Sequence, residues 1–512
     1  NMEVGIAKDK NQLKELMQEC DYVVYDGKDN FYETIEQISD RDWRLKTKVC
    51  VEQRLPNGFK VNGTRFSSIK ELLMYLKETG KSKLTHEDEV IIKGSLDELI
   101  DFAQQMVYLG FSPAIYTEDD YQRKVRCDRF VENKRELLND GHNITKKILE
   151  YQCTPEEYAQ VQVYRDDLLK VFHEIEKYIT STDDVKINTA VFATKKSGKS
   201  MVINGILKGD YSPTSLELAT PTSIEYIPVS GKTNYTLKKD GQTTDFRRLE
   251  DLSHEIKKYF EDLQKAGNKT ATPLEVYYPA STLNQPIEIY DTPGPDRAGS
   301  EHAKYFEEYL KKTDCAVFVM DYSKHLQESE KDILIKITNE INQNEGKDKV
   351  IIVALNKIDL AFSDAGTSRN FIRISEFIRN ELRKIGFKHV IVIPISAMWY
   401  FYGMYIKQHY PHINELKDLM DLESNSPEEN DIITAVENTG NNLRRQIGIK
   451  NPTINDLIAF TNFEIFQDIL FSFSKSRVYY SKIWNSVVGV QNNIYYMTNL
   501  LNALTIDISD KK

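Results

Sequence analysis

The stretch that decides the fold runs from Ile187 to Ile203 and reads INTAVFATKKSGKSMVI. Its first part, residues 187–192, is typical of a β-strand, and an apolar helix start follows at 201–203. The segment between them follows the spacing G-x-x-x-x-G-K-S, in which backbone N–H groups surround a phosphate. Ala193 replaces the first glycine, which keeps the N–H donor but restricts the backbone. The stretch therefore predicts a phosphate-binding loop between a strand and a helix.

Two residues of this loop have roles that follow from phosphate chemistry. Lys199 is expected to contact the β- and γ-phosphate oxygens, and the Ser200 hydroxyl is expected to bind Mg²⁺. Further residues of the loop are expected to contact the nucleotide, namely Lys195, Gly198 and Met201. The loop thus predicts a nucleoside triphosphate with Mg²⁺ as the ligand.

A second motif ends another strand. Residues 286–294 read PIEIYDTPG, a β-rich run that closes in D-T-P-G. We expect the Asp291 carboxylate to hold Mg²⁺ through water, and the backbone N–H of Gly294 to sense the γ-phosphate. This motif adds a metal ligand and a γ-phosphate contact to the predicted site.

A third motif indicates which base is bound. Residues 350–359 read VIIVALNKID, a buried strand followed by N-K-x-D. The Asp359 carboxylate can accept hydrogen bonds from both N1–H and the exocyclic amine of guanine, a pair that adenine lacks. Asn356 and Lys357 complete this nucleotide-binding motif. The motif predicts recognition of guanine.

A fourth strand ends near the same base. Residues 390–397 read VIVIPISA, and a backbone N–H at Ser396-Ala397 is expected to meet guanine O6. The four motifs occur in order, each after a β-rich run, and ligands of open α/β sheets bind at the carboxyl ends of the strands. Together they predict a GTPase fold.

A switch threonine should lie between the phosphate-binding loop and D-T-P-G. Thr222 directly precedes the strand-like run 224–229, so it is our first choice for binding Mg²⁺ and positioning the attacking water. Thr220 is the alternative.

Composition and charge limit the other functions. The chain has 512 residues, of which 40% are hydrophobic and 28% charged, as expected for several globular domains. Its net charge of −11 argues against nucleic acid as the main partner. The 5 scattered cysteines and the absence of a basic region followed by an apolar stretch at the start favour a cytoplasmic chain. The apolar run 390–406 contains Pro394 and Gly403 and is interpreted as a strand and a helix start rather than a membrane segment.

The chain around the motifs divides into further segments. Residues 1–127 alternate strand-like and helix-like runs and are predicted to form a small N-terminal α/β domain for assembly or partner docking. Residues 184–440 are predicted to be the GTPase domain. The remaining parts, 128–183 and 441–512, are predicted to be helical, and the second of them includes a helix that closes the GTPase domain.

The two helical segments share an apolar periodicity. The helical pattern begins at about Phe130, and T-P-E-E at 154–157 predicts a helix start, because a hydroxyl cap, a proline and acidic residues all suit a helix N-terminus. This helix should run from Pro155 to near Thr180. Apolar residues recur at spacings of three and four in it and again in 479–504, which predicts a helical neck bundle. The alternative is that the segments pack in separate domains.

With these motifs the chain resembles the dynamin superfamily of large GTPases, and most closely the bacterial dynamin-like proteins. The resemblance is carried by T-P-T at 220–222, D-T-P-G at 291–294, the strand 315–321, N-K-I-D at 356–359 and the helix 451–463. It covers roughly residues 130–512 and implies an α/β P-loop GTPase domain flanked by a helical neck bundle. The small N-terminal α/β domain predicted in front of it is not a usual element of that family. The trunk and membrane-inserting paddle of that family have no clear counterpart in this sequence.

The resemblance also implies catalytic residues. Lys196 occupies the position at which dynamin-like GTPases place a polar residue near a monovalent cation, and at which guanylate-binding relatives place an arginine finger. We therefore assign Lys196 to transition-state charge neutralisation in cis, together with Ser197 and Thr222 in the catalytic set. The alternative for Lys196 is a solvated lysine.

The function implied by the resemblance is hydrolysis of GTP to GDP and phosphate with Mg²⁺. Nucleotide-dependent dimerisation would be coupled through the neck to membrane remodelling or tethering. The expected partners are a second copy or a related dynamin-like protein, and membrane lipid for the full-length protein. No nucleic acid is expected, and peripheral contact would be at the inner face of the membrane. The alternatives are a slowly hydrolysing, GTP-dependent assembly scaffold and a ribosome-assembly GTPase.

Overall fold

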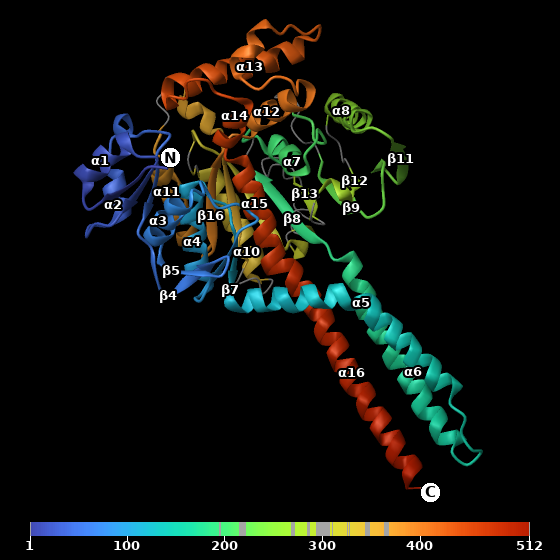
Figure 1. Cartoon of the computed structure of the whole chain (residues 1–512). Helices are drawn as coiled ribbons and strands as arrows, with labels where there is room; N and C mark the ends of the chain where they lie inside the picture. Colours follow the sequence, from blue (N-terminus) through green and yellow to red (C-terminus); the bar gives the residue numbers. More distant parts are fainter. Residues whose placement is uncertain are drawn as a thin grey trace. The chain divides into compact units, whose positions relative to one another are not determined.

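The computed structural model (Figure 1) describes residues 2–193, 196–214, 222–267, 272–283, 287–292, 308–309, 311–324, 326, 328–343, 349–362 and 368–510. The chain divides into two compact units. The first unit comprises Asn1–Thr117 and Asn188–Phe473, and the second comprises Glu118–Ile187 and Ser474–Lys512. Each unit is described by itself below.

A nine-stranded sheet forms the centre of the first unit, in the order β11-β10-β12-β9-β13-β8-β14-β15-β16. Its strands are β8 (Ile187–Ala193), β9 (Ile224–Val229), β10 (Tyr235–Lys239), β11 (Gln242–Phe246), β12 (Leu274–Pro279), β13 (Ile287–Asp291), β14 (Cys315–Asp321), β15 (Ile351–Asn356) and β16 (Val390–Ile395). Strands β8, β14, β15 and β16 are parallel neighbours, whereas β9 and β13 are antiparallel. The strands predicted at 187–192, 224–229, 350–355 and 390–395 are confirmed to within one residue.

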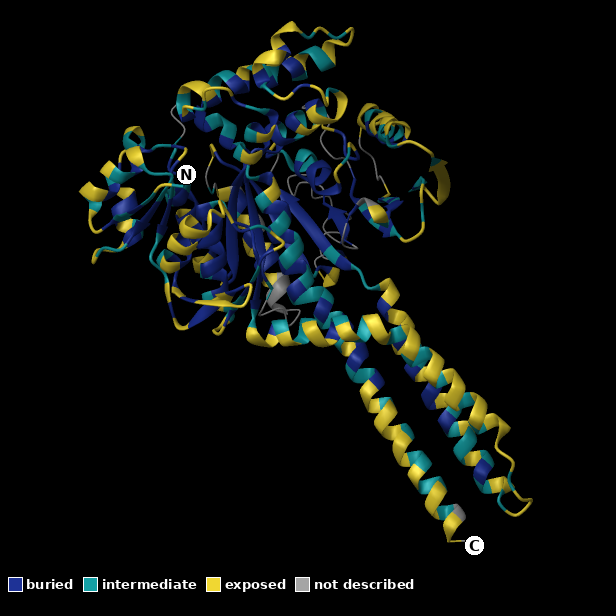
Figure 2. Cartoon of the chain, in the orientation of Figure 1, coloured by how far each residue is buried: buried dark blue, intermediate teal, exposed yellow. Residues whose placement is uncertain are grey.

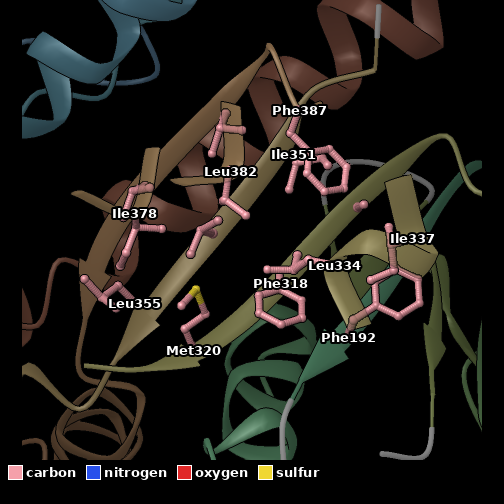
Figure 3. Packing of buried hydrophobic residues seen from close by; sticks show 14 of the residues in the cluster. Phe192, Phe318, Met320, Leu334, Ile337, Ile351, Leu355, Ile378, Leu382 and Phe387 are labelled. Carbon is pink, nitrogen blue, oxygen red and sulfur yellow. The ribbon is translucent and has the colours of Figure 1, made fainter. Parts of the chain in front are cut away.

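Helices cover this sheet, and apolar side chains fill the space between them. The helices are α7 (Lys199–Leu207), α8 (Leu249–Lys265), α10 (Glu328–Gln343), α11 (Phe371–Ile385), α12 (Ala397–His409), α13 (Pro427–Asn442), α14 (Ile454–Phe460) and α15 (Phe463–Phe473). Figure 3 shows Phe318 and Met320 of β14 packed with Leu334 of α10 and with Ile378 and Leu382 of α11. Strands covered on both faces need apolar residues at nearly every position, which explains their continuous apolar runs.

The apolar run 390–406 is divided between two elements. β16 ends at Ile395, and the Ser396 hydroxyl accepts the backbone N–H of Trp399, which caps the N-terminus of α12. None of the helices in the described ranges is long and apolar enough to cross a membrane.

Residues 1–117 contain two smaller sheets. The first has β1 (Val4–Ala7), β2 (Tyr22–Tyr25) and β3 (Lys48–Val51), all parallel. The second has the order β5-β4-β6-β7, with β4 (Arg54–Val61), β5 (Thr64–Ser68), β6 (Glu89–Ile92) and β7 (Ala114–Thr117). Their helices are α1 (Lys10–Glu19), α2 (Phe31–Glu36), α3 (Ile69–Thr79) and α4 (Leu96–Leu109).

Residues 1–117 pack on the β16 side of the nine-stranded sheet, as part of the same unit. Arg379 of α11 is almost fully buried there and donates to Asp101 of α4 at 2.6 Å and to Glu376 at 2.9 Å. The Tyr108 hydroxyl donates to the same Glu376 carboxylate at 2.6 Å. A buried guanidinium is tolerated because these acceptors compensate its charge.

The second unit consists of three long helices, α5 (Glu118–Glu150), α6 (Tyr158–Ser181) and α16 (Tyr480–Ser509). One apolar cluster joins Val171, Ile175 and Ile179 of α6 to Val490 of α16. Farther along, the Tyr164 hydroxyl donates to Asp507 at 2.8 Å. Figure 2 shows buried stripes along these helices and exposed residues on their other faces. The apolar stripes predicted in the two segments therefore face each other.

Two helix starts differ from the prediction. α5 begins at Glu118 rather than near Phe130, so residue 127 lies inside a helix. α6 begins at Tyr158 with no side-chain cap, because residues 155–157 form a turn. The Glu157 carboxylate accepts the backbone N–H of Thr154 at 3.1 Å, so the capping residue and the acid act in a turn before the helix.

Candidate functional site

The predicted motifs meet at one edge of the nine-stranded sheet. β8, β14, β15 and β16 are parallel, so their carboxyl ends lie at the same edge. Residues 196–198 follow β8 with one gap, Lys357 follows β15 and Ser396 follows β16. This is the edge at which open α/β sheets bind their ligands.

One position of the phosphate-binding loop, residue 198, accommodates only glycine. Gly198 has φ +93°, and a Cβ there would lie 2.3 Å from the side-chain nitrogen of Asn356. Gly198 is also the N-cap residue of α7, and no side chain caps that helix end. The N-terminal N–H groups of α7 are thus available to an anion, which fits a phosphate.

The lysine of the loop contacts the aspartate of the second motif. The Lys199 ammonium lies 2.6 Å from the Asp291 carboxylate and also donates to the Thr292 carbonyl. Asp291 is fully buried, and burial raises its pKa, whereas Lys199 favours the ionised form. The ion pair neutralises a carboxylate that would otherwise be costly to bury. A phosphate that attracted Lys199 would compete directly with Asp291.

Asn356 connects the phosphate-binding loop to the fourth motif. Its side-chain nitrogen donates to the Ser197 carbonyl at 2.8 Å, and its side-chain oxygen accepts the backbone N–H of Ala397 at 3.0 Å. The Ser396 hydroxyl donates to Asp359 at 2.8 Å. Burial raises the pKa of Asp359, and the Ser396 hydrogen bond opposes this shift. The Asn356 side chain therefore joins backbone groups of two other motifs, and the Ser396 and Asp359 side chains pair with each other.

Lys357 forms a second link between the motifs. Its ammonium donates to the Lys196 carbonyl at 2.7 Å and to the Asp321 carboxylate at 2.8 Å. The Lys196 side chain itself is exposed. The ammonium of Lys357 therefore holds the backbone of the phosphate-binding loop.

Three predicted metal ligands occupy different environments. Ser200 lies in the first turn of α7 and Asp291 at the end of β13, and oxygen ligands of this kind suit Mg²⁺. Thr222 is buried just before β9, and its hydroxyl donates to the Thr272 carbonyl at 3.0 Å. Ser200 and Asp291 have oxygen donors that suit magnesium, but Asp291 would have to exchange Lys199 and Thr222 would have to exchange the Thr272 carbonyl for the ion.

Several predicted residues contribute little to the described contacts. Met201 lies half-buried in the first turn of α7. Lys195, Gly294 and the alternative switch residue Thr220 lie outside the described residues.

Comparison with known proteins identifies the part of the chain that contains most of these motifs. Residues 189–358 match the family model described as Dynamin family. Residues 189–358 are thus similar to the dynamin family, and we call them the dynamin-family segment. The dynamin-family segment includes the phosphate-binding loop, Asp291 and Asn356, whereas Asp359 and Ser396 follow it.

Three similar proteins show how far the likeness extends. An uncharacterized protein in the xynA 3' region of Caldicellulosiruptor sp. (strain Rt8B.4) is 30% identical over 207 residues, which is 40% of this chain and 46% of that protein. The second is a structure of an oligomerised bacterial dynamin pair, which was described as providing a mechanism for the long-range sensing and tethering of membranes. It is 13% identical, the match covers 81% of this chain and 62% of that chain, and the TM-score is 0.40. Era of Aquifex aeolicus bound to GDP.AlF4- is 17% identical over 41% of this chain and 51% of that chain, with a TM-score of 0.23. This chain thus spans less than half of the curated relative that it matches.

The sequence motifs of the dynamin-family segment do not include every residue that shapes the site. Asp321 at the end of β14 contacts Lys357, and Asn204 of α7 accepts the backbone N–H groups of Tyr211 at 3.0 Å and Ser212 at 2.7 Å. A polar residue at the end of the buried strand 315–320 was the available signal for Asp321. Asn204 carries no such signal, because its partners depend on how the chain turns after α7.

Proposed function

We propose that this protein binds GTP at the edge described above and hydrolyses it to GDP and phosphate. The observation that carries the proposal is the pair of Asn356 hydrogen bonds, which join the phosphate-binding loop to the loop at Ala397. Beside them Ser396 holds the Asp359 carboxylate, the group with the chemistry to accept both guanine N–H donors. Through these bonds, the single side chain of Asn356 fixes the separation between the proposed phosphate site and the proposed guanine site.

Each residue of the site has its own proposed role in phosphoryl transfer. Lys199 would leave Asp291 and contact the phosphates, while the α7 N–H groups surround them. Ser200 and Asp291, with Thr222 after its rearrangement, would hold Mg²⁺, which supplies charge neutralisation when bound. Thr222 would also orient the attacking water, and Ser197 keeps the loop attached to Asn356. The exposed Lys196 side chain is proposed to add positive charge in cis once dimerisation orders the loop.

For the whole protein we propose nucleotide-dependent dimerisation coupled to membrane remodelling or tethering. The match of residues 189–358 to the dynamin family model supports this proposal. The three helices of the second unit are proposed to serve as the neck, because their shared apolar seam makes them one mechanical element. Residues 1–117 are proposed to serve assembly.

A specificity change tests the guanine site. An amide in place of the Asp359 carboxylate would present a donor, which suits the C2 carbonyl of xanthine but not the C2 amine of guanine. We expect Asp359→Asn to weaken GTP binding and to gain binding of XTP, measured by nucleotide competition against a fluorescent GDP. Unchanged GTP preference in Asp359→Asn would contradict the proposed guanine site.

Two further measurements separate hydrolysis from scaffolding. Phosphate release from GTP, with and without liposomes, is expected to show turnover that rises when lipid is present. Tight GTP retention without turnover would instead indicate the assembly scaffold. Co-sedimentation of the protein with anionic liposomes in GTP, GDP or no nucleotide tests the membrane proposal, and the same low binding in all three would contradict it for this chain.

A further inference from the structure

Asp321 lies at the sheet edge where the predicted motifs meet, at the end of β14, which runs between β8 and β15. It is the last residue of β14, and in the sheet register it lies beside Asn356 of β15. Its side chain is only 4% exposed. A buried carboxylate at this edge needs strong donors, because burial alone would favour its neutral form.

The Asp321 carboxylate has two sets of donors. One oxygen accepts the Ser323 backbone N–H at 2.9 Å and the Ser323 hydroxyl at 2.6 Å, and the other accepts the Lys357 ammonium at 2.8 Å. Burial raises the pKa of Asp321, but the hydrogen bonds from Lys357 and Ser323 outweigh it, so that the net shift is downward. The carboxylate is therefore ionised and fixed in orientation by its own chain.

The fixed carboxylate determines where the Lys357 ammonium lies. The same ammonium donates to the Lys196 carbonyl at 2.7 Å. Both lysines have left-handed backbones, with φ +64° at Lys196 and φ +75° at Lys357. Such conformations are unfavourable for residues with a side chain and persist only where other contacts hold them. The ammonium between Asp321 and the carbonyl is a contact that joins both strained residues.

We propose that Asp321 is a positioning residue for guanine-nucleotide binding, because it holds Lys357 against the backbone of the phosphate-binding loop. The inference rests on the proposed function, since it assigns Asp321 to the same nucleotide site. Loss of the Asp321 carboxylate should free the Lys357 ammonium and loosen the loop that surrounds the phosphates. The rate of GDP dissociation then reports on this contact.

The test measures dissociation of N-methylanthraniloyl-GDP from the full chain. We expect Asp321→Asn to speed dissociation about tenfold, the size expected for a lost charge-assisted hydrogen bond. Asp332→Asn on α10 is the matched control, because Asp332 is exposed and the substitution removes the same charge. Asp321→Glu keeps a carboxylate and should release GDP clearly more slowly than Asp321→Asn. Equal release by the two variants would overturn the inference.

A double substitution separates positioning from a general effect on folding. In a Lys357→Met background, Asp321→Asn should add no further acceleration, since the ammonium it positions is gone. An equal acceleration in both backgrounds, or none in the wild-type background, would overturn the inference. If the wild-type chain binds no guanine nucleotide at all, the proposed function itself fails, which is a distinguishable result.

Discussion

The side-chain amide of Gln104 in α4 pairs with both backbone groups of Val392 in β16. Its nitrogen donates to the Val392 carbonyl and its oxygen accepts the Val392 N–H, each at 2.8 Å. β16 is the last strand of the sheet, so these backbone groups have no further strand to pair with. The adjacent Gln105 accepts the N–H of Val51 in β3 at 3.1 Å, so α4 serves two sheet edges.

Removal of the Gln104 amide should destabilise the first unit. Gln104→Met keeps the length of the side chain but leaves the buried N–H and C=O of Val392 unpaired. We expect the free energy of unfolding to fall by about 2–4 kcal/mol, because each unpaired buried group costs ~1–3 kcal/mol. Chemical denaturation of the full chain measures this. Gln122→Met on the exposed face of α5 is the control, and an equal effect of both substitutions would contradict the prediction.

A methyl group at Gly198 should disturb the nucleotide site beyond its backbone cost. In Gly198→Ala the new Cβ would lie 2.3 Å from the Asn356 side-chain nitrogen, which donates to the Ser197 carbonyl. We expect the loss of that hydrogen bond and of nucleotide binding, measured with fluorescent GDP. Gly231→Ala is a matched control, because Gly231 also has a left-handed backbone, φ +72°, but nothing within 4 Å of the added Cβ. The control should lose about 1 kcal/mol of stability and keep full binding; similar binding by the two variants would count against the role of Gly198.

Because Lys199 pairs with Asp291, replacing this lysine should reduce both nucleotide binding and stability. Lys199→Met should abolish nucleotide binding, because the phosphates lose their ammonium. It should also destabilise the nucleotide-free protein by about 3 kcal/mol, because a fully buried Asp291 loses the cation beside it. Isothermal titration with GDP and thermal unfolding measure the two effects. Lys258→Met on the exposed face of α8 controls for the lost charge, and unchanged GDP affinity in Lys199→Met would refute the phosphate-loop assignment.

Glu225 of β9 should make stability fall as the pH rises. Burial and the neighbouring Glu288 raise the pKa of Glu225 to about 8. The folded chain then binds a proton that the unfolded chain releases near its ordinary pKa of 4.5, so stability decreases between these two values and is constant above the higher one.

Glu225→Gln removes this titration and should flatten the dependence of the melting temperature on pH between pH 5 and 8, as measured by differential scanning fluorimetry. The gain in stability over the wild type should be largest at the alkaline end of this range. Glu250→Gln on the exposed surface of α8 is the control and should keep the wild-type slope. An unchanged slope in Glu225→Gln would show that another group titrates.

The parts of the protein that sequence alone determined are those with a local pattern. Buried parallel strands read as continuous apolar runs, and each ends at a short motif, so the strands at 187–192 and 390–395 and the positions of Lys199 and Asn356 at one sheet edge followed from the chain itself. The apolar stripes of α6 and α16 were likewise visible as spacings of three and four.

The tertiary structure alone decided which distant groups meet. Gln104 and Val392 are 288 residues apart, and Lys357 and Lys196 are 161 apart, so no local periodicity links them. The start of α6 at Tyr158 was also decided there, because residues 155–157, which the sequence pattern placed in the helix, form a turn before it. Buried polar groups and charges must find partners wherever the fold brings them, and the partners of Asp291, Asp321 and Val392 depend on the packing of the whole unit.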